Sequence, residues 1–329
     1  MVALTRRTAM TTLAAATVLA GTVGAQTTIG QTAAGQRIGV RGTRLYVEDT
    51  GPRDAPALLY LHGGPGAGSF DFSLYQRDRL NATLRTVILD QRGVLRSDPV
   101  DACTLDDLIA DCEALRQTLG IPAWTVIGHS FGGGLALLYA SRHPATVTRV
   151  IFENPAVDIR TSVKSLLIAA ADVFDRMDKR ADARAARDLA QSQKPTPELW
   201  HAFGDIGGRL GKHRDDLYTH RPELHDFFGR MVAASGLPGD VWARGGRQQS
   251  LLNQDPALFE DHRPLLAGLR QPSLLIKGAY DHVTSVEQVE AIAAAPGARP
   301  VRLFADSAHF VHVEEPDAYA AAVIGFVHD

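Results

Sequence analysis

One short stretch, residues 125–134, constrains the fold more than any other part of this sequence. It begins with a run of β-branched residues typical of a buried strand, turns through Gly128, Ser130 and Gly132, and continues into a segment rich in Ala and Leu that is typical of a helix. The glycines let a strand and a helix pack closely, and the serine in such a turn projects its hydroxyl. The pattern predicts that Ser130 is a nucleophile. It also predicts that the backbone N–H of Phe131, at the helix start, is placed to bind an anion.

The simpler interpretation of this stretch is a glycine-rich turn with a bystander serine, because G-x-S-x-G also occurs by chance. A serine hydroxyl becomes a nucleophile only beside a base, and that base needs an orienting acid. The rest of the sequence must therefore supply a histidine and a carboxylate at matching positions.

The first 25 residues have the composition of an export signal. Arg6 and Arg7 precede an apolar run over residues 13–23, which ends in the small residues before Ala25. This order predicts a signal peptide cleaved after Ala25, of either the twin-arginine or the general secretory kind, and a secreted or periplasmic protein. The run is too short to span a bilayer, so we expect no stable membrane insertion after cleavage. The alternative is a disordered N-terminus in a cytoplasmic protein.

Composition and net charge limit the kinds of molecule that this protein is expected to bind. The chain is 45% hydrophobic and 22% charged with a net charge of −3, which favours an ordinary soluble core and excludes a strong electrostatic attraction to nucleic acid. We therefore expect a small-molecule or short-peptide substrate. The two cysteines, Cys103 and Cys112, are separated by nine residues of expected helix, about 13 Å, which is too far for a disulfide. We expect no metal and no cofactor.

After a flexible leader over residues 26–36, the sequence alternates strands and helices. Residues 37–50 alternate apolar and polar positions, as expected of an antiparallel hairpin. Continuous apolar runs then alternate with helical segments, which predicts a mostly parallel, doubly wound α/β sheet with its chemistry at the strand C-terminal ends. The expected strands are 57–61, 86–89, 125–127 and 150–152, and the expected helices are 73–81, 104–119 and 131–143.

The alternation of strands and helices stops over residues 157–268, where no apolar run typical of a strand is found. We interpret this region as an inserted helical cap. The sheet pattern resumes with strands at 273–278 and 300–304 and helices at 286–295 and 316–327. The predicted catalytic domain is therefore made of residues 37–156 and 269–329.

The base and the acid follow the last two expected strands. Asp281 comes after the strand at 273–278 and His309 after the strand at 300–304, so both lie on the same sheet edge as Ser130. We assign Ser130 as nucleophile, His309 as general base and acid, and Asp281 as the orienting acid. His312 is an alternative base and Glu153 an alternative acid. We also assign Glu153, with Trp200 of the cap, to substrate binding.

A second glycine-rich stretch, His62 to Gly66, directly follows the strand at 57–61. Acyl transfer builds negative charge on a carbonyl oxygen, and two converging backbone N–H groups stabilise it. Glycine allows such groups to face the site without obstruction. The predicted oxyanion hole consists of the N–H of Gly64, or of Gly63, together with that of Phe131. We expect His62 to hold this loop and His129 to pack.

The motifs together resemble the proline iminopeptidase branch of the α/β-hydrolases. The resemblance rests on residues 62–66, 90–93 and 128–133 with Asp281 and His309, and it covers the catalytic domain. It implies an α/β-hydrolase fold and removal of N-terminal proline or small residues from peptides without a metal. For residues 90–93, the sequence Asp-Gln-Arg-Gly, we expect a structural turn pinned by an Arg–Asp pair.

The chain departs from that branch at several positions. His129 and Phe131 flank the nucleophile where Gly or Ser and Trp are typical, and Ala308 stands where glycine commonly precedes the histidine. The branch carries a Trp-Glu pair in its cap that helps to bind the free amino terminus, whereas Trp200 is followed here by His201. Candidate replacements for that acid are Glu198, Asp205 and Glu223.

Two other functions fit the same sequence. A carboxylesterase or lactonase would use the same machinery with an apolar acyl pocket, for which the candidate residues are Trp200, Phe203, Phe227 and Trp242. A hydrolase fold without catalysis, used as a ligand receptor, is the third possibility, and the intact Ser130, His309 and Asp281 argue against it.

Overall fold

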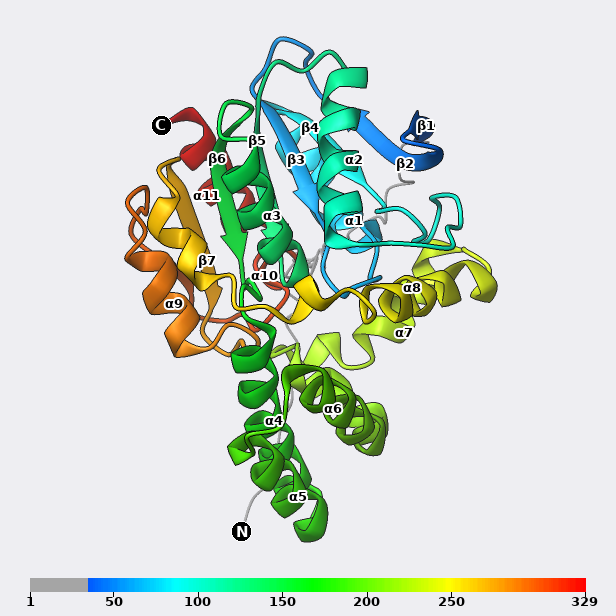
Figure 1. Cartoon of the computed structure of the whole chain (residues 1–329), viewed down its shortest axis with the longest axis vertical. Coiled ribbons are helices and arrows are strands. Elements are labelled where there is room, and N and C mark those ends of the chain that lie inside the picture. The colour runs from blue at the N-terminus through cyan, green and yellow to red at the C-terminus, as the bar shows by residue number, and fades with distance from the viewer. Residues whose placement is uncertain (1–34) are drawn as a thin grey trace, which may run out of the picture. The chain divides into compact units, whose positions relative to one another are not determined.

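The computed structural model describes residues 35–329 (Figure 1). The predicted signal peptide and nearly all of the predicted leader lie outside the described residues. The leader was placed one residue too far, because Gln36 already begins the first strand, β1 (Gln36–Val40). No described helix is both long and apolar enough to cross a membrane.

The described residues form one eight-stranded sheet in the order β1-β2-β4-β3-β5-β6-β7-β8. β1 pairs antiparallel with β2 (Thr43–Thr50), and β2 pairs antiparallel with β4 (Arg85–Leu89). All other pairings are parallel, as the continuous apolar runs predict. The remaining strands are β3 (Ala57–Leu61), β5 (Trp124–His129), β6 (Val147–Glu153), β7 (Ser273–Gly278) and β8 (Arg302–Phe304).

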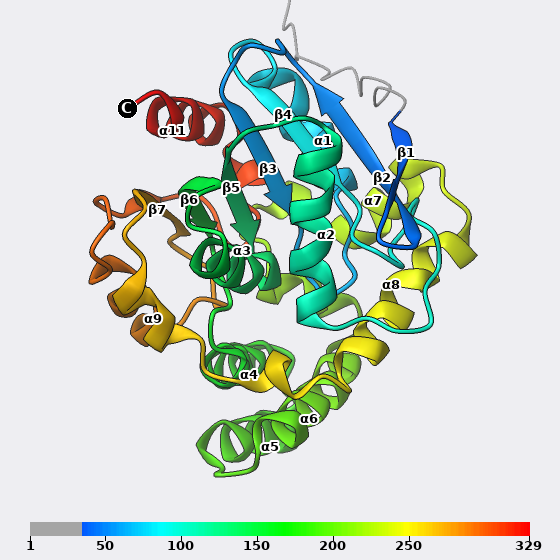
Figure 2. The same ribbon diagram turned by 45° about the horizontal axis from the view of Figure 1, so that its top comes forward.

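Helices cover both faces of the sheet because the side chains of a strand alternate between its faces. In β3, Leu59 and Leu61 pack into the core that includes α2 (Leu105–Thr118) and α3 (Phe131–Arg142). Leu58 and Tyr60 pack on the opposite face, in the core that includes α1 (Phe70–Leu80) and α11 (Pro316–His328). Figure 2 shows α2 and α3 in front of the sheet. Two further helices follow β6 outside the cap, α9 (Val286–Ala293) and the short α10 (Val311–Glu314).

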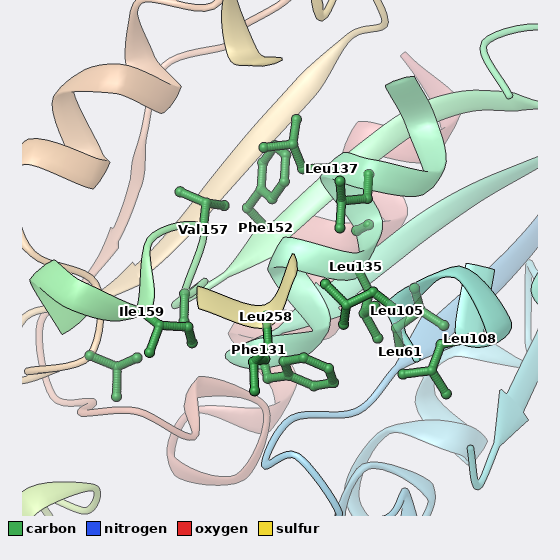
Figure 3. Packing of buried hydrophobic residues seen from close by; sticks show 14 of the residues in the cluster. Leu61, Leu105, Leu108, Phe131, Leu135, Leu137, Phe152, Val157, Ile159 and Leu258 are labelled. Carbon is green, nitrogen blue, oxygen red and sulfur yellow. The ribbon is translucent and has the colours of Figure 1, made fainter. Parts of the chain in front are cut away.

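The start of α3 rests on a well-packed apolar cluster (Figure 3). Phe131 and Leu135 of α3 lie in the same buried cluster as Leu105 and Leu108 of α2 and Leu258 of a 3-10 turn. These contacts fix the first turn of α3, and with it the position of Ser130. The two cysteines border this region as buried free thiols.

Within the described residues, only helices and turns lie between β6 and β7. The main helices are α4 (Ile159–Arg176), α5 (Arg180–Gln191), α6 (Thr196–Leu210), α7 (Phe227–Ser235) and α8 (Gly239–Leu252). The apolar face of α4, which includes Val163, Leu167 and Phe174, packs against α5 and α6. Figure 1 shows these three helices beyond the end of the sheet toward which β3 and β6 point.

Helix α8 docks this cap onto the loops that follow β3 and β4. Arg244 donates to the carbonyl oxygens of Leu95 and Ser97 at 3.0 and 3.2 Å, and Gln248 donates to the carbonyl of Arg92 at 2.9 Å. Gly245 lies against Gly66 so closely that a Cβ on Gly245 would be 2.1 Å from the Gly66 oxygen. A wall of the cap is therefore fixed directly against the glycine-rich loop.

Candidate active site

Ser130 occupies a strained turn between β5 and α3. Its φ is 56° and its ψ is −124°, a conformation that costs an L residue about 1–3 kcal/mol. The surroundings enforce it, since the Ser130 N–H donates to the Glu153 carbonyl at 3.0 Å and its own carbonyl accepts from the N–H groups of Gly133 and Ala156. A Cβ on Gly128 would lie 2.2 Å from the Gly132 oxygen, so only glycine fits there.

The glycine-rich loop lies directly beside this serine. A Cβ on Gly63 would be 2.8 Å from Cβ of Ser130, and Gly64 has a φ of 116° that favours glycine. Phe131 is the first residue of α3, so its N–H has no intrahelical acceptor. The structure thus brings together Ser130 and all three residues predicted for the oxyanion hole.

His62 holds this loop, as expected from the sequence. Its ring is buried, which lowers its pKa and keeps it neutral. The N–H of Gln91 donates to Nε2 of His62 at 3.1 Å, and Nδ1 of His62 lies 2.9 Å from the Gly63 carbonyl oxygen and 3.3 Å from the Gly68 nitrogen. The imidazole therefore joins the loop after β3 to the turn after β4.

The turn at residues 90–93 is pinned by an Arg–Asp pair, but not by its own arginine. Asp90 is bound by Arg96 at 2.7 Å, whereas Arg92 forms a two-pronged pair with Asp111 of α2 at 2.6 Å. Burial alone would raise the pKa of Asp90, and Arg96 reverses this and lowers it. Asp90 also accepts from the backbone and hydroxyl of Ser69, so it ties the start of α1 to the sheet.

Asp281 and His309 form a direct contact. Nδ1 of His309 donates to Oδ1 of Asp281 at 2.8 Å, and both side chains are buried. Burial alone would raise the pKa of Asp281, but the bond from His309, the charge of Lys277 and backbone donors hold it well below its usual range. Asp281 is therefore ionised, and its contact with Nδ1 fixes the orientation of the His309 ring.

His309 is further positioned through its backbone. Its carbonyl accepts from Asn154 at 2.9 Å and from Nε2 of His129 at 3.1 Å, and its N–H donates to the carbonyl of Tyr218 in the cap. Burial lowers the pKa of His129 to about 3, so His129 stays neutral and acts as a packed donor, as the sequence predicted. Ser130 and His309 line the same cavity.

Comparison with known proteins identifies the family. Residues 56–316 match the model of the alpha/beta hydrolase fold. This chain belongs to the α/β-hydrolase family. Within the family it is similar to the proline iminopeptidase of Neisseria gonorrhoeae, with 43% identity over 116 residues. That match covers 34% of this chain and only 36% of the relative.

Two solved structures share the fold of this α/β-hydrolase. A proline iminopeptidase-related protein of Thermus thermophilus superposes with a TM-score of 0.68 at 24% identity, over 89% of this chain and 96% of the other. The enol-lactonase of Burkholderia xenovorans superposes with a TM-score of 0.63 at 21% identity, over 89% of this chain and 100% of the other. Identities this low show the fold alone.

The hydrolase has a cavity of about 580 Å³ between the sheet edge and the cap. Of the sequence-predicted cap residues, Trp200, Phe203 and Asp205 line it. Phe227 instead belongs to a separate apolar cluster near α7, and Trp242 packs against that cluster. Glu198 is exposed and forms an ion pair with Lys194. Asp71, Arg214, Phe228, Gln249 and Asn253 also line the cavity, and no local sequence motif marks them.

The assignment of Glu153 to substrate binding does not fit the structure. Its carboxylate is fully buried and accepts from the backbone N–H and Nδ1 of His312 and from the hydroxyl of Tyr319. It is not among the residues that line the cavity. The same contacts remove Glu153 and His312 as an alternative acid and base, because they bind each other rather than the serine. Sequence spacing placed Glu153 at a strand end but could not show that α10 covers it.

One group of described side chains has the residue types of a metal site. Ligand atoms of His129, Glu153 and His312 all lie within 4.8 Å of one another. Each atom is already engaged, because His129 Nε2 binds the His309 carbonyl and Glu153 binds His312. Hydrogen bonding and the charge on His312 account for this cluster without a metal.

The buried His312 should make the stability of this hydrolase fall at alkaline pH. Burial alone would lower the pKa of His312, but Glu153 and Asp71 outweigh it and raise the pKa to about 10. An unfolded histidine has a pKa of about 6.5. The stabilisation is therefore fully present below about pH 6.5 and is lost as pH rises through about 10. We expect the free energy of unfolding, measured with urea from pH 6 to 10, to decline across this window.

A matched pair of variants tests whether His312 causes that decline in the free energy of unfolding. His312→Gln should remove much of the pH dependence in this window, whereas His328→Gln, at the exposed C-terminus, should retain it. An equal slope in wild type and His312→Gln would contradict a charged His312.

Gly63→Ala should damage catalysis by displacing the glycine-rich loop over residues 62–66, which is predicted to form the oxyanion hole. The added methyl would meet Cβ of Ser130 at 2.8 Å, so the loop or the serine must shift. We expect kcat/KM to fall on the order of 10²-fold, the typical effect of losing one oxyanion donor. Gly204→Ala is the control, because Gly204 also lines the cavity but an added Cβ there has open space. Equal activity of the two variants would show that the position of this loop does not affect catalysis.

Proposed function

We propose that this chain is an exported serine hydrolase with the triad Ser130, His309 and Asp281, and that it is an aminopeptidase of the proline iminopeptidase type. The observation that carries the proposal is the 2.8 Å contact between His309 Nδ1 and Asp281, in a cavity wall shared with Ser130. It leaves His309 Nε2 free to accept a proton. The strained backbone of Ser130 supports the same assignment.

In the proposed reaction, Ser130 Oγ attacks the carbonyl carbon of the substrate while His309 Nε2 takes its proton. The N–H groups of Phe131 and of Gly64, or Gly63, stabilise the oxyanion. His309 then protonates the departing amine, which leaves an acyl-enzyme on Ser130. Water, activated by His309, hydrolyses that ester and restores the serine. Asp281 stabilises the imidazolium in both halves.

An aminopeptidase must bind a free amino terminus, since an unpaired buried ammonium is costly. Two carboxylates line the cavity, Asp71 from α1 and Asp205 from α6. The relatives named proline iminopeptidase support this substrate class.

The second candidate function is a carboxylesterase or lactonase. The observation that favours it is the apolar side of the cavity, where Ile159, Val163, Leu166, Phe203 and Phe310 are lining residues. The Trp200 indole, moreover, is bound to Asn253 and not to an acid. An ester needs no amine anchor, so such a wall suffices to hold an acyl group.

A substrate panel separates the two. Proline, alanine and phenylalanine p-nitroanilides are compared with p-nitrophenyl acetate and butyrate, with Ser130→Ala as background. We expect Ser130-dependent release of p-nitroaniline, fastest from the proline substrate. Turnover of esters alone would assign the esterase function. Failure of the pure protein to label with a fluorophosphonate would instead favour a ligand receptor.

Export is part of the proposal and rests on residues 1–25. We expect the mature protein to begin at Gln26, which N-terminal sequencing of the secreted form checks. Replacing Arg6 and Arg7 by lysine should retain the precursor inside the cell if the twin-arginine route is used. A full-length protein in the cytoplasm of cells expressing the unaltered gene would contradict export.

A further inference from the structure

Asp71 is a carboxylate on the catalytic side of the cavity that the proposed mechanism does not use. It lies in the first turn of α1, a few residues after the oxyanion loop. Its side chain is 17% exposed, and it lines the same cavity as Gly63, Gly64 and Ser130. It therefore belongs to the same rigid half of the site as the nucleophile.

Asp71 contacts a buried histidine, His312, which in turn contacts a second buried carboxylate, Glu153. His312 Nε2 lies 3.4 Å from Asp71 Oδ2, and His312 Nδ1 lies 2.8 Å from Glu153 Oε1. With a carboxylate at each ring nitrogen, the imidazole holds both protons and is positively charged. The trio of Asp71, His312 and Glu153 then carries two negative charges and one positive charge, a net −1.

The excess negative charge resides on Asp71. Glu153 has no exposure and three donors at 2.8 to 3.0 Å, two from His312 and one from Tyr319. Asp71 has the longer contact to His312, and its other oxygen accepts from the adjacent Phe72 N–H at 2.8 Å. The start of α1 also favours an anion. A largely desolvated carboxylate that opens into a cavity is stabilised by a cation there.

We propose that Asp71 binds the protonated amine of the substrate, and so replaces the cap acid that stands beside tryptophan in the proline iminopeptidase branch. This inference rests on the proposed function. Asp205, the other acid that lines the cavity, is exposed on the cap, where water screens its charge. Asp71 is more desolvated and is fixed to the half of the site that holds Ser130, so it can set the distance between amine and carbonyl.

The test compares two activated esters that differ at one atom. The p-nitrophenyl esters of proline and of cyclopentanecarboxylic acid have the same ring size, but only the first carries an ammonium. Wild type should prefer the proline ester in kcat/KM. Asp71→Asn should lose about 10- to 100-fold on the proline ester, the usual range for a hydrogen bond to a charged group, and leave the cyclopentane ester unchanged. Ser130→Ala supplies the background rate.

Two controls separate binding from structure. Asp205→Asn should leave the preference unchanged, and Asp71→Asn should label with a neutral fluorophosphonate at the wild-type rate. An equal loss on both esters would show that Asp71 only positions the loop, and an unchanged preference would place the amine elsewhere. Either result overturns the inference, as does a wild type without preference.

A binding measurement keeps this test independent of turnover. Calorimetry with L-prolinamide is done on Ser130→Ala, with and without Asp71→Asn. Weaker binding only in the double variant supports Asp71 even if no peptide amide is cleaved, which would contradict the aminopeptidase proposal alone. Equal binding in both proteins overturns the role of Asp71.

Discussion

Ser130→Ala is expected to abolish turnover of every substrate of this protein. The substitution removes only the hydroxyl group, and the proposed acyl-enzyme cannot form without it. By analogy with other serine hydrolases, kcat should fall on the order of 10⁶-fold. The fold should persist, because the contacts that hold this turn come from the backbone of Ser130 and not from its hydroxyl. Steady-state kinetics and thermal denaturation measure the two effects.

Ser250→Ala is the matched control, since Ser250 is an exposed serine whose hydroxyl donates a hydrogen bond to the Gly246 carbonyl within α8. It should retain wild-type activity. Residual turnover in Ser130→Ala that is well above the uncatalysed rate, with an acyl-enzyme still detected by mass spectrometry, would place the nucleophile elsewhere.

The second large effect is expected for Asp281→Asn. An amide in place of the carboxylate no longer stabilises the imidazolium of His309 and permits the wrong tautomer, so we expect kcat to fall about 10⁴-fold. The change also leaves Lys277, now 3.1 Å from Asp281 Oδ2, without its carboxylate. A moderate loss of thermal stability should accompany the loss of activity, and the two are measured separately.

Asp306→Asn tests whether removing any carboxylate near His309 lowers the rate. Asp306 is exposed in the loop that precedes His309, and its replacement should leave the rate unchanged. If Asp281→Asn is almost as active as wild type while a folded Glu153→Gln is inactive, Glu153 and not Asp281 is the acid.

The strand–turn–helix pattern around Ser130 determined its own structure. The apolar run and the two glycines leave one way to join β5 to α3, and the positive φ of Ser130 follows from it. The parallel sheet was equally predictable, because strands buried on both faces read as continuous apolar runs. The position of Asp281 and His309 after successive strands placed them on one edge.

Contacts between distant segments were not predictable in the same way. The sequence predicted an Arg–Asp pair at the turn over residues 90–93 but not its members, and the structure has Arg96 bound to Asp90 and Arg92 bound to Asp111 of α2. Glu153 follows a strand just as Asp281 and His309 do, but α10 covers it and makes it a buried partner of His312.

Local sequence thus determined the main strands and helices, the parallel sheet and the placement of Ser130, Asp281 and His309 after strands of that sheet, because these depend on hydrophobic period and on backbone conformations that only certain residues adopt. Only the tertiary structure decided which side chains face the cavity. Asp71 sits in a helix with no local mark of function, and it faces the cavity because His312, 241 residues away in sequence, packs behind it. Charge burial depends on such distant neighbours, and no local pattern encodes them.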